Sequence, residues 1–297
     1  RGGRSGRPSG RSASGGSATA LGATGAAAAS CSQLALPLDE VLLPLFAAPF
    51  DWRLGRCALV GSSGDLRGGG RGPEIDAHKT VIRMNRLPAA AYLGDMGART
   101  DVYFKNLLAD YAPNHTAVRY MDLPGVVGGP GQVSWCDHAS GSGCVFRAVL
   151  FEGASTVQEE QLGWLNATRP GAVPRARQAD GLQRVENTLA FLPKNKAPSA
   201  GLKAFLTAAA LCDSLRLYGF GGDASLDGHM PVRTRHSLTE EHAFMARAAK
   251  GESLQADFAT LDAGVPLAED QGAAVFAEAL RGRLECLGRT GAIRLTP

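Results

Sequence analysis

The chain has 297 residues, 44% of them hydrophobic, with 31 basic and 28 acidic side chains. This composition is typical of a globular chain long enough for one large domain or two small ones. Arg1, Arg4, Arg7 and Arg11 all lie in the first eleven residues, and without them 27 basic residues face 28 acidic ones. The near-neutral remainder argues against a nucleic-acid groove, so we expect no nucleic-acid partner.

The beginning of the chain differs in composition from the rest. Residues 1–30 are mainly Gly, Ser, Ala and Arg and offer almost nothing to bury. We therefore expect a disordered tail or stem over residues 1–50, although a processing remnant explains this composition equally well. Residues 51–297 form the expected folded domain.

No run of residues is long enough to span a membrane. The apolar stretch 34–50 is interrupted by two acids and three prolines. A membrane connection is expected only through an anchor upstream of Arg1. Two glycosylation sequons, at Asn114 and Asn166, and an even number of cysteines favour a secretory compartment.

Apolar runs with strand character alternate with helical patterns along the remainder. Strands are expected at 56–61, 80–85, 100–104, 144–151 and 215–220. Helices are expected at 199–212, 239–251 and 272–288, the first of them with Ser199 as its N-cap. This order predicts an α/β fold, a Rossmann-like largely parallel sheet flanked by helices. The Gly-, Pro- and Ala-rich residues 107–144 and 163–200 are expected to form surface loops.

A glycine-rich loop follows the first strand, which is typical of a backbone that approaches a ligand closely. It lacks the ending of a P-loop, and Gly61, Gly64 and Gly68 are spaced too widely for the dinucleotide pattern. A nicotinamide-dependent oxidoreductase is one alternative, but no ribose-binding acid with the required spacing is found. A purely structural turn is another.

Three ordered segments together resemble the sialylmotifs of the animal-type sialyltransferases, glycosyltransferase family 29. Residues 57–104 resemble the large motif, residues 197–223 resemble the small motif, and His236 with Glu241 resembles the very short motif. The resemblance implies a sialyltransferase-like catalytic domain with a GT-A-like variant of the α/β fold. It also identifies the chain as a divergent member, because Ser62 stands for the family's asparagine and Ala200 for a hydroxyl residue. The third motif is degenerate as well.

The resemblance implies transfer of sialic acid from CMP-sialic acid to a glycan hydroxyl on a glycoprotein or glycolipid, with inversion and without a metal or cofactor. A monophosphate leaving group carries less charge than a diphosphate, so helix N-termini and neutral donors can hold it without a cation. The departures fit a branch that uses a related acid sugar such as Kdo, or a non-catalytic homologue that binds a nucleotide or glycan. The implied location is the Golgi lumen, with a type II membrane anchor.

The motifs assign roles to individual residues. His236 is the expected catalytic base, because a neutral imidazole can take the proton of the attacking hydroxyl. His229 is expected to stabilise the departing phosphate, and Glu241 either orients the site or caps the helix that begins near Thr239. The expected donor-binding residues are Gly61, Ser62, Ser63, Gly64, Asn85, Ser199, Ala200, Gly201 and Gly221. Asn85 suits the cytosine edge or the ribose.

Six cysteines show no zinc-binding spacing, and no metal ligands are expected. The resemblance implies a disulfide between Cys57 and Cys212, which joins the large and small motifs. Local pairing of Cys136 with Cys144 remains open. The remaining two, Cys31 and Cys286, are not assigned. Asp76 and His78 of the large motif are expected to be structural.

Overall fold

The computed structural model describes most of the domain in several segments. These segments are residues 31–44, 50–61, 63–84, 90–105, 148–152, 175–221, 236–258 and 271–296. The predicted strand at 144–151 is described from residue 148 onward. The expected loop at 107–144 lies outside the described residues.

A sheet of eight strands forms the centre of the described fold, in the order β1-β6-β5-β4-β3-β2-β7-β8. Its strands are β1 (Leu42–Pro44), β2 (Gly55–Val60), β3 (Thr80–Met84), β4 (Val102–Lys105), β5 (Ala148–Phe151), β6 (Arg175–Gln178), β7 (Cys212–Tyr218) and β8 (Ile293–Thr296). Every neighbouring pair is parallel except β1 with β6, which is antiparallel. The predicted α/β class with a largely parallel sheet is confirmed.

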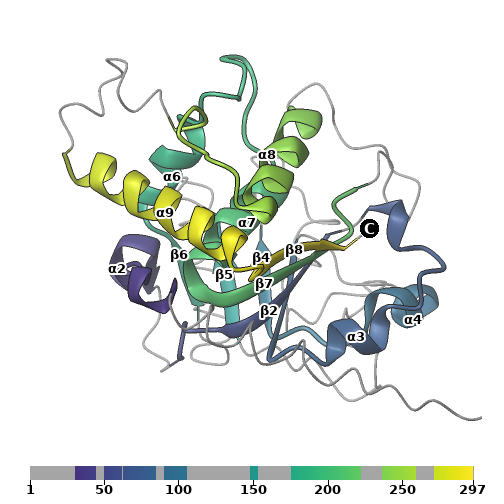
Figure 1. Cartoon of the computed structure of the whole chain (residues 1–297). Coiled ribbons are helices and arrows are strands. Elements are labelled where there is room, and N and C mark those ends of the chain that lie inside the picture. Colours follow the sequence, from purple (N-terminus) through teal and green to yellow (C-terminus); the bar gives the residue numbers. More distant parts are fainter. Residues whose placement is uncertain are drawn as a thin grey trace, which may run out of the picture.

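Helices cover both faces of this sheet (Figure 1). One face carries α2 (Leu38–Val41), α6 (Asp180–Asn187), α7 (Ala200–Leu211), α8 (Leu238–Lys250) and α9 (Gln271–Arg289), and the other carries α3 (Gly72–Asp76) and α4 (Leu93–Met96). In β2, Cys57 and Leu59 point into the larger core, whereas Ala58 and Val60 point into the smaller one. This alternation follows from the two-residue period of a strand. Burial on both faces explains why β2 reads as a continuous apolar run.

Two disulfides join distant parts of the chain. The predicted pair Cys57–Cys212 is confirmed, with a Cα–Cα distance of 6.1 Å between the neighbouring strands β2 and β7. A second disulfide, Cys31–Cys286, ties the segment before β1 to α9. The buried guanidinium of Arg283 donates to the carbonyl oxygens of Cys31 (3.1 Å) and Cys212 (2.7 Å). The Arg283 side chain therefore binds the backbone of one cysteine from each disulfide.

The expected boundary of the tail at residue 50 needs correction for residues 31–44. Leu36 and Val41 are buried in the main core, and Leu42 pairs with Gln178 of β6. This segment is packed because the disulfide at Cys31 and the β1–β6 pairing hold it against the domain. Asp39 and Glu40 lie in the short helix α2, Pro37 is its N-cap residue, and Pro44 is the last residue of β1.

The expectation of a surface loop over residues 163–200 is wrong where β6 and α6 lie. Strand β6 has the polar sequence RARQ, and it is a strand because its backbone pairs with β5 and β1 on either side. Helix α6 is short and buries only Leu182, Val185 and Glu186. Neither element has an apolar pattern long enough to be read from the sequence. Within the described residues, no helix combines the length and the apolarity needed to cross a membrane.

Candidate active site

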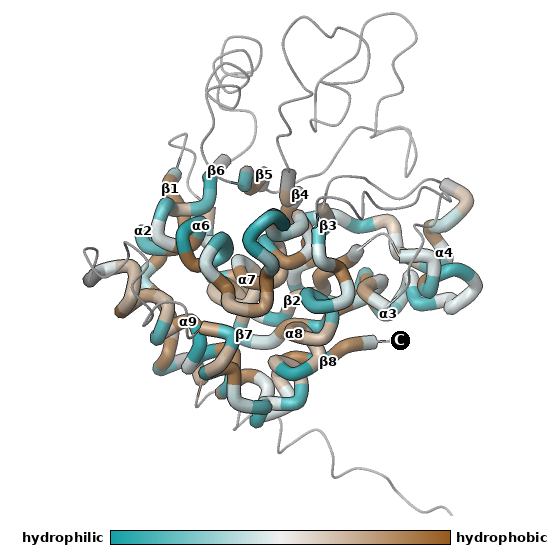
Figure 2. The backbone as a smooth tube through the Cα atoms, turned by 90° about the horizontal axis from the view of Figure 1, so that it is seen from above, coloured by the Kyte–Doolittle hydropathy of each residue, from teal (hydrophilic) through white to brown (hydrophobic). Residues whose placement is uncertain are grey.

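The order in which successive strands join the sheet reverses at β2, and this switch point defines the candidate site. From β2 the chain proceeds through β3, β4, β5 and β6 towards one edge, and it later returns to place β7 on the other side of β2. Figure 2 shows β3, β4, β5, β6 and β1 following one another away from this point. In open α/β sheets, ligands bind outside the carboxyl ends of the strands at such a switch point. The loops after β2 and β7 contain the glycine residues that the sequence singled out.

The two loops interlock through their glycines. The Gly61 N–H donates to the Tyr218 carbonyl oxygen at 2.7 Å, and the Ser63 N–H donates to the Gly219 carbonyl oxygen at 3.3 Å. A Cβ atom on Gly61 would lie 2.3 Å from the Gly219 oxygen, which no side chain tolerates. Gly219 itself has φ +72°. The N–H groups of Gly61 and Ser63 are thus engaged inside the protein, and the donor-binding roles expected of these two residues stay predictions.

A carboxylate completes the contact between the loops. Asp65, in the single 3₁₀ turn Gly64–Leu66, accepts a hydrogen bond from the Gly221 N–H through Oδ2 at 3.0 Å. Gly221 follows β7, and a Cβ atom there would lie 2.7 Å from the same oxygen. Asp65 is not among the residues predicted from the sequence, although its place inside the large motif was a usable signal.

The rest of the large motif builds a framework beside the site. Asp95 accepts hydrogen bonds from the N–H groups of Gly68 and Gly70, each at 2.8 Å. These bonds lower the pKa of Asp95. Asp76 accepts from the backbone of Arg99 at 3.0 Å, which agrees with its expected structural role. The later glycines of the loop therefore bind a carboxylate of their own chain.

Arg83 forms the buried centre of this framework. Its guanidinium donates to the carbonyl oxygens of Met96 (2.7 Å), Gly97 (3.0 Å) and Arg99 (3.0 Å). Burial lowers the pKa of Arg83 to about 10, and the charges of Asp76 and Asp101 oppose this shift. The arginine of the large motif thus fixes the loop that follows α4.

The amino end of α7 binds a glutamate from α8. The Ser199 hydroxyl accepts from the Leu202 N–H at 3.2 Å, which is the capping bond that the sequence predicted. The Ser199 N–H donates to Glu241 Oε1 at 2.9 Å, and the hydroxyl donates to Glu241 Oε2. Burial raises the pKa of Glu241, while the Ser199 bonds and the charges of His236 and Lys203 lower it.

Glu241 therefore holds α7 rather than capping its own helix. Of its two expected roles, the orienting one fits this geometry. The same bonds use the Ser199 N–H, which the sequence analysis assigned to the donor. Ala200 and Gly201 open the first turn of α7, and a Cβ atom on Gly201 would lie 3.4 Å from the Phe220 ring. The start of α7 and the end of β7 are thus adjacent.

His236 lies beside this helix terminus. Its Nδ1 is 2.8 Å from the Ala197 carbonyl oxygen, two residues before the N-cap Ser199. When Nδ1 carries the proton it donates to this carbonyl, and Nε2 is then a proton acceptor. The ring is half-buried, and His236 directly precedes Ser237, the N-cap residue of α8. The structure therefore brings His236 close to the Ser199–Glu241 contact and orients its ring through the Ala197 carbonyl oxygen.

Several predicted residues lie outside the described part of the chain. They are Ser62, Asn85, His229, the sequons at Asn114 and Asn166, and the cysteines Cys136 and Cys144. Their roles and the pairing of these cysteines stay predictions.

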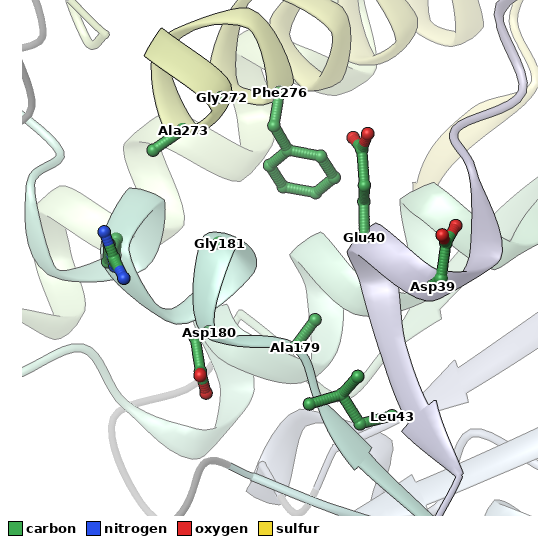
Figure 3. Close-up of a pocket in the computed structure, with 10 residues that line it drawn as sticks. Asp39, Glu40, Leu43, Ala179, Asp180, Gly181, Gly272, Ala273 and Phe276 are labelled. Carbon is green, nitrogen blue, oxygen red and sulfur yellow. The ribbon is translucent and has the colours of Figure 1, made fainter. Parts of the chain in front are cut away.

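A separate cleft of about 320 Å³ lies at the far end of the sheet (Figure 3). It is bounded by α2, by the start of α6 and by α9, and the Phe276 ring projects into it beside Glu40. Strands β5, β4 and β3 lie between β6 and β2 in the sheet. The cleft contains none of the predicted site residues.

The described fold and site thus define a doubly wound α/β protein with a switch-point site. A sequence profile of glycosyltransferase family 29 (sialyltransferase) matches residues 34–125. The predicted resemblance of the chain to this family is therefore confirmed.

Three curated relatives illustrate the relationship. CMP-N-acetylneuraminate-beta-galactosamide-alpha-2,3-sialyltransferase 2 of Mus musculus is 28% identical over 182 residues, which are 59% of this chain and 45% of the relative. The alpha-2,3-sialyltransferase 1 of Gallus gallus is 30% identical over 181 residues, 59% and 46% of the two chains. Sialyltransferase-like protein 2 of Oryza sativa subsp. indica is 28% identical over 194 residues, 61% and 48%. The chain spans about half the length of these relatives.

Proposed function

We propose that the protein is an inverting, metal-independent glycosyltransferase that moves sialic acid, or a related acid sugar, from a CMP-activated donor to a glycan hydroxyl. The observation that carries this proposal is the position of His236 beside the Ser199–Glu241 contact, at the carboxyl edge of the sheet. The names of the relatives support the donor class, and open α/β sheets generally bind ligands at a switch point of the kind found at β2.

In the proposed reaction one proton is transferred and the nucleotide CMP is displaced from the sugar. The acceptor hydroxyl gives its proton to Nε2 of His236 while its oxygen attacks the anomeric carbon of the donor. The bond from that carbon to the phosphate oxygen breaks, and CMP leaves with the electron pair. Attack opposite the leaving group inverts the anomeric centre. The carbonyl of Ala197 keeps the Nδ1 proton in place, so the ring presents its basic nitrogen to the acceptor.

A nucleoside monophosphate carries less charge than a diphosphate and can be held without a cation, so we propose that no metal takes part. We place the protein in the Golgi lumen with a type II anchor outside this sequence. His229 is assigned to the departing phosphate and Asn85 to the cytidine.

The test is a transfer assay with CMP-sialic acid and CMP-Kdo as alternative donors and a panel of glycan acceptors. CMP should raise the melting temperature through binding to the native state, and chelators should not weaken this effect. Unchanged melting at millimolar CMP, together with absent transfer from both donors, would contradict the proposal.

The second candidate is a non-catalytic homologue that binds the nucleotide or a glycan. Ser62 and Ala200 depart from the family pattern, and the N–H groups of Gly61, Ser63 and Ser199 are engaged within the protein. This candidate predicts CMP binding without donor hydrolysis or transfer. A donor-hydrolysis assay on protein that binds CMP separates the two.

A further inference from the structure

Asp65 places a fixed negative charge at the switch point. Its Oδ2 accepts from Gly221 at 3.0 Å, so the loop after β7 holds an acid from the loop after β2. The Asp65 side chain is exposed and therefore faces the solvent side of this edge. Gly221 admits no side chain without displacing the carboxylate. The charge is thus part of the contact between the two loops.

Other N–H and cationic groups at this edge of the sheet are also bound by carboxylates of the protein. The Ser199 N–H at the start of α7 donates to the Glu241 carboxylate. Lys203, one turn further along α7, forms an ion pair with Glu152 at 3.3 Å. Backbone N–H groups and cations that could have received phosphate oxygens are, in these three cases, already matched by carboxylates of the protein.

We propose that Asp65 makes the donor site selective by charge, favouring nucleotides with one phosphate and disfavouring nucleoside diphosphates. The inference rests on the proposed function, because it requires the nucleotide to bind over the ends of β2 and β7. Each added phosphate brings roughly one more negative charge towards the Asp65 carboxylate. In water, the repulsion between two negative unit charges about 6 Å apart weakens binding about threefold.

The test compares CMP with CDP by calorimetry on the full chain and on three variants. Asp65→Asn keeps an acceptor for the Gly221 N–H but removes the charge, and Asp65→Glu keeps the charge. Asp51→Asn is the matched control, because Asp51 is an exposed acid before β2, at the opposite end of the strand.

The measured quantity is the ratio of the two dissociation constants. We expect Asp65→Asn to shift it about two- to fivefold in favour of CDP at low salt, and less at high salt, where screening is stronger. Asp65→Glu and Asp51→Asn should leave the ratio within twofold of the parent.

Three results would overturn the inference. If Asp65→Asn binds CMP like the parent but shows an unchanged ratio, the charge does not select the nucleotide and the proposed function is unaffected. If Asp65→Asn weakens both ligands equally and irrespective of salt, Asp65 is only a loop contact. A parent protein that does not bind CMP would overturn both this inference and the proposed function.

Discussion

Ser199 and Glu241, which lie 42 residues apart, join the small and very short motifs, because the cap of α7 binds the carboxylate of α8 through both its N–H and its hydroxyl. The contact is fully buried on the side of Glu241. It fixes the start of α7 against the start of α8, directly after His236. The glutamate of the very short motif thus contributes to the site by positioning rather than by contact with its own helix terminus.

This contact predicts a large energetic coupling between the two side chains. Ser199→Ala should lower the free energy of unfolding by about 1–3 kcal/mol, because it removes a cap and leaves a buried carboxylate with one donor fewer. In a double-mutant cycle with Glu241→Gln, the coupling should be about 1–3 kcal/mol. Urea unfolding of the four proteins measures it.

Ser237→Ala is the matched control for this cycle. Ser237 is also a buried N-cap residue, but its side chain makes no capping hydrogen bond in α8. Additive effects of Ser199→Ala and Glu241→Gln would contradict the coupling.

Loss of His236 should remove catalysis but leave nucleotide binding. His236→Ala should lower the transfer rate by about 10²–10⁴-fold, as expected when a general base is lost. CMP affinity should stay within a few-fold of the parent, because the ring serves the acceptor. Steady-state transfer and CMP calorimetry measure the two effects.

His242→Ala, six residues later on α8, is the control and should retain transfer. A fully active His236→Ala would remove the proposed mechanism. A His236→Ala protein that unfolds would instead assign the histidine a structural role.

Glu186 should make the protein less stable as the pH rises. Burial raises the pKa of Glu186 to about 8, with Lys203 and Gln178 opposing the shift and Glu152 adding to it. Below about pH 4 the folded and unfolded states are both protonated. Between about pH 4 and pH 8 only the unfolded state ionises, so unfolding is increasingly favoured, with a slope of up to about 1.4 kcal/mol per pH unit.

Glu186→Gln should flatten this decline and show a smaller loss of stability between pH 5 and pH 8 than the parent. The control is Glu240→Gln, which alters an exposed acid on α8. Urea unfolding at pH 5, 6, 7 and 8 measures the slopes. Identical slopes in Glu186→Gln and the parent would show that Glu186 does not retain its proton on folding.

The disulfide Cys31–Cys286 should stabilise the fold by constraining the unfolded chain. The two cysteines are 255 residues apart, with Cys57–Cys212 nested between them. The inner disulfide shortens the loop that Cys31–Cys286 closes to roughly 100 residues. In the chain-entropy model, closing a loop of this length stabilises the fold by about 4–5 kcal/mol. The variant with both Cys31 and Cys286 replaced by Ser should lose a stability of that order.

Peptide mapping without reduction, on protein made in a secretory host, should find Cys31 linked to Cys286 and Cys57 linked to Cys212. Free thiols at all four positions would contradict the pairing. A double variant as stable as the parent would show instead that packing alone holds the segment before β1.

The sequence by itself determined the alternating architecture and the motifs. Strand β2, helix α7 and strand β7 are readable because their apolar residues recur with the period of the element that they form. The capping role of Ser199 is local, so the residue type and its position suffice. The pairing of Cys57 with Cys212 came from the motif resemblance.

Only the tertiary structure decided the features that depend on distant partners. Strand β6 is polar, and it is a strand because β5 and β1 pair with its backbone. Backbone N–H groups carry no sequence signal, so the engagement of Gly61 by Tyr218 and of Gly221 by Asp65 could not be read in advance. Hydrogen bonds across a sheet or between loops are set by spatial neighbours, whereas a local pattern reports only the residues next to it along the chain.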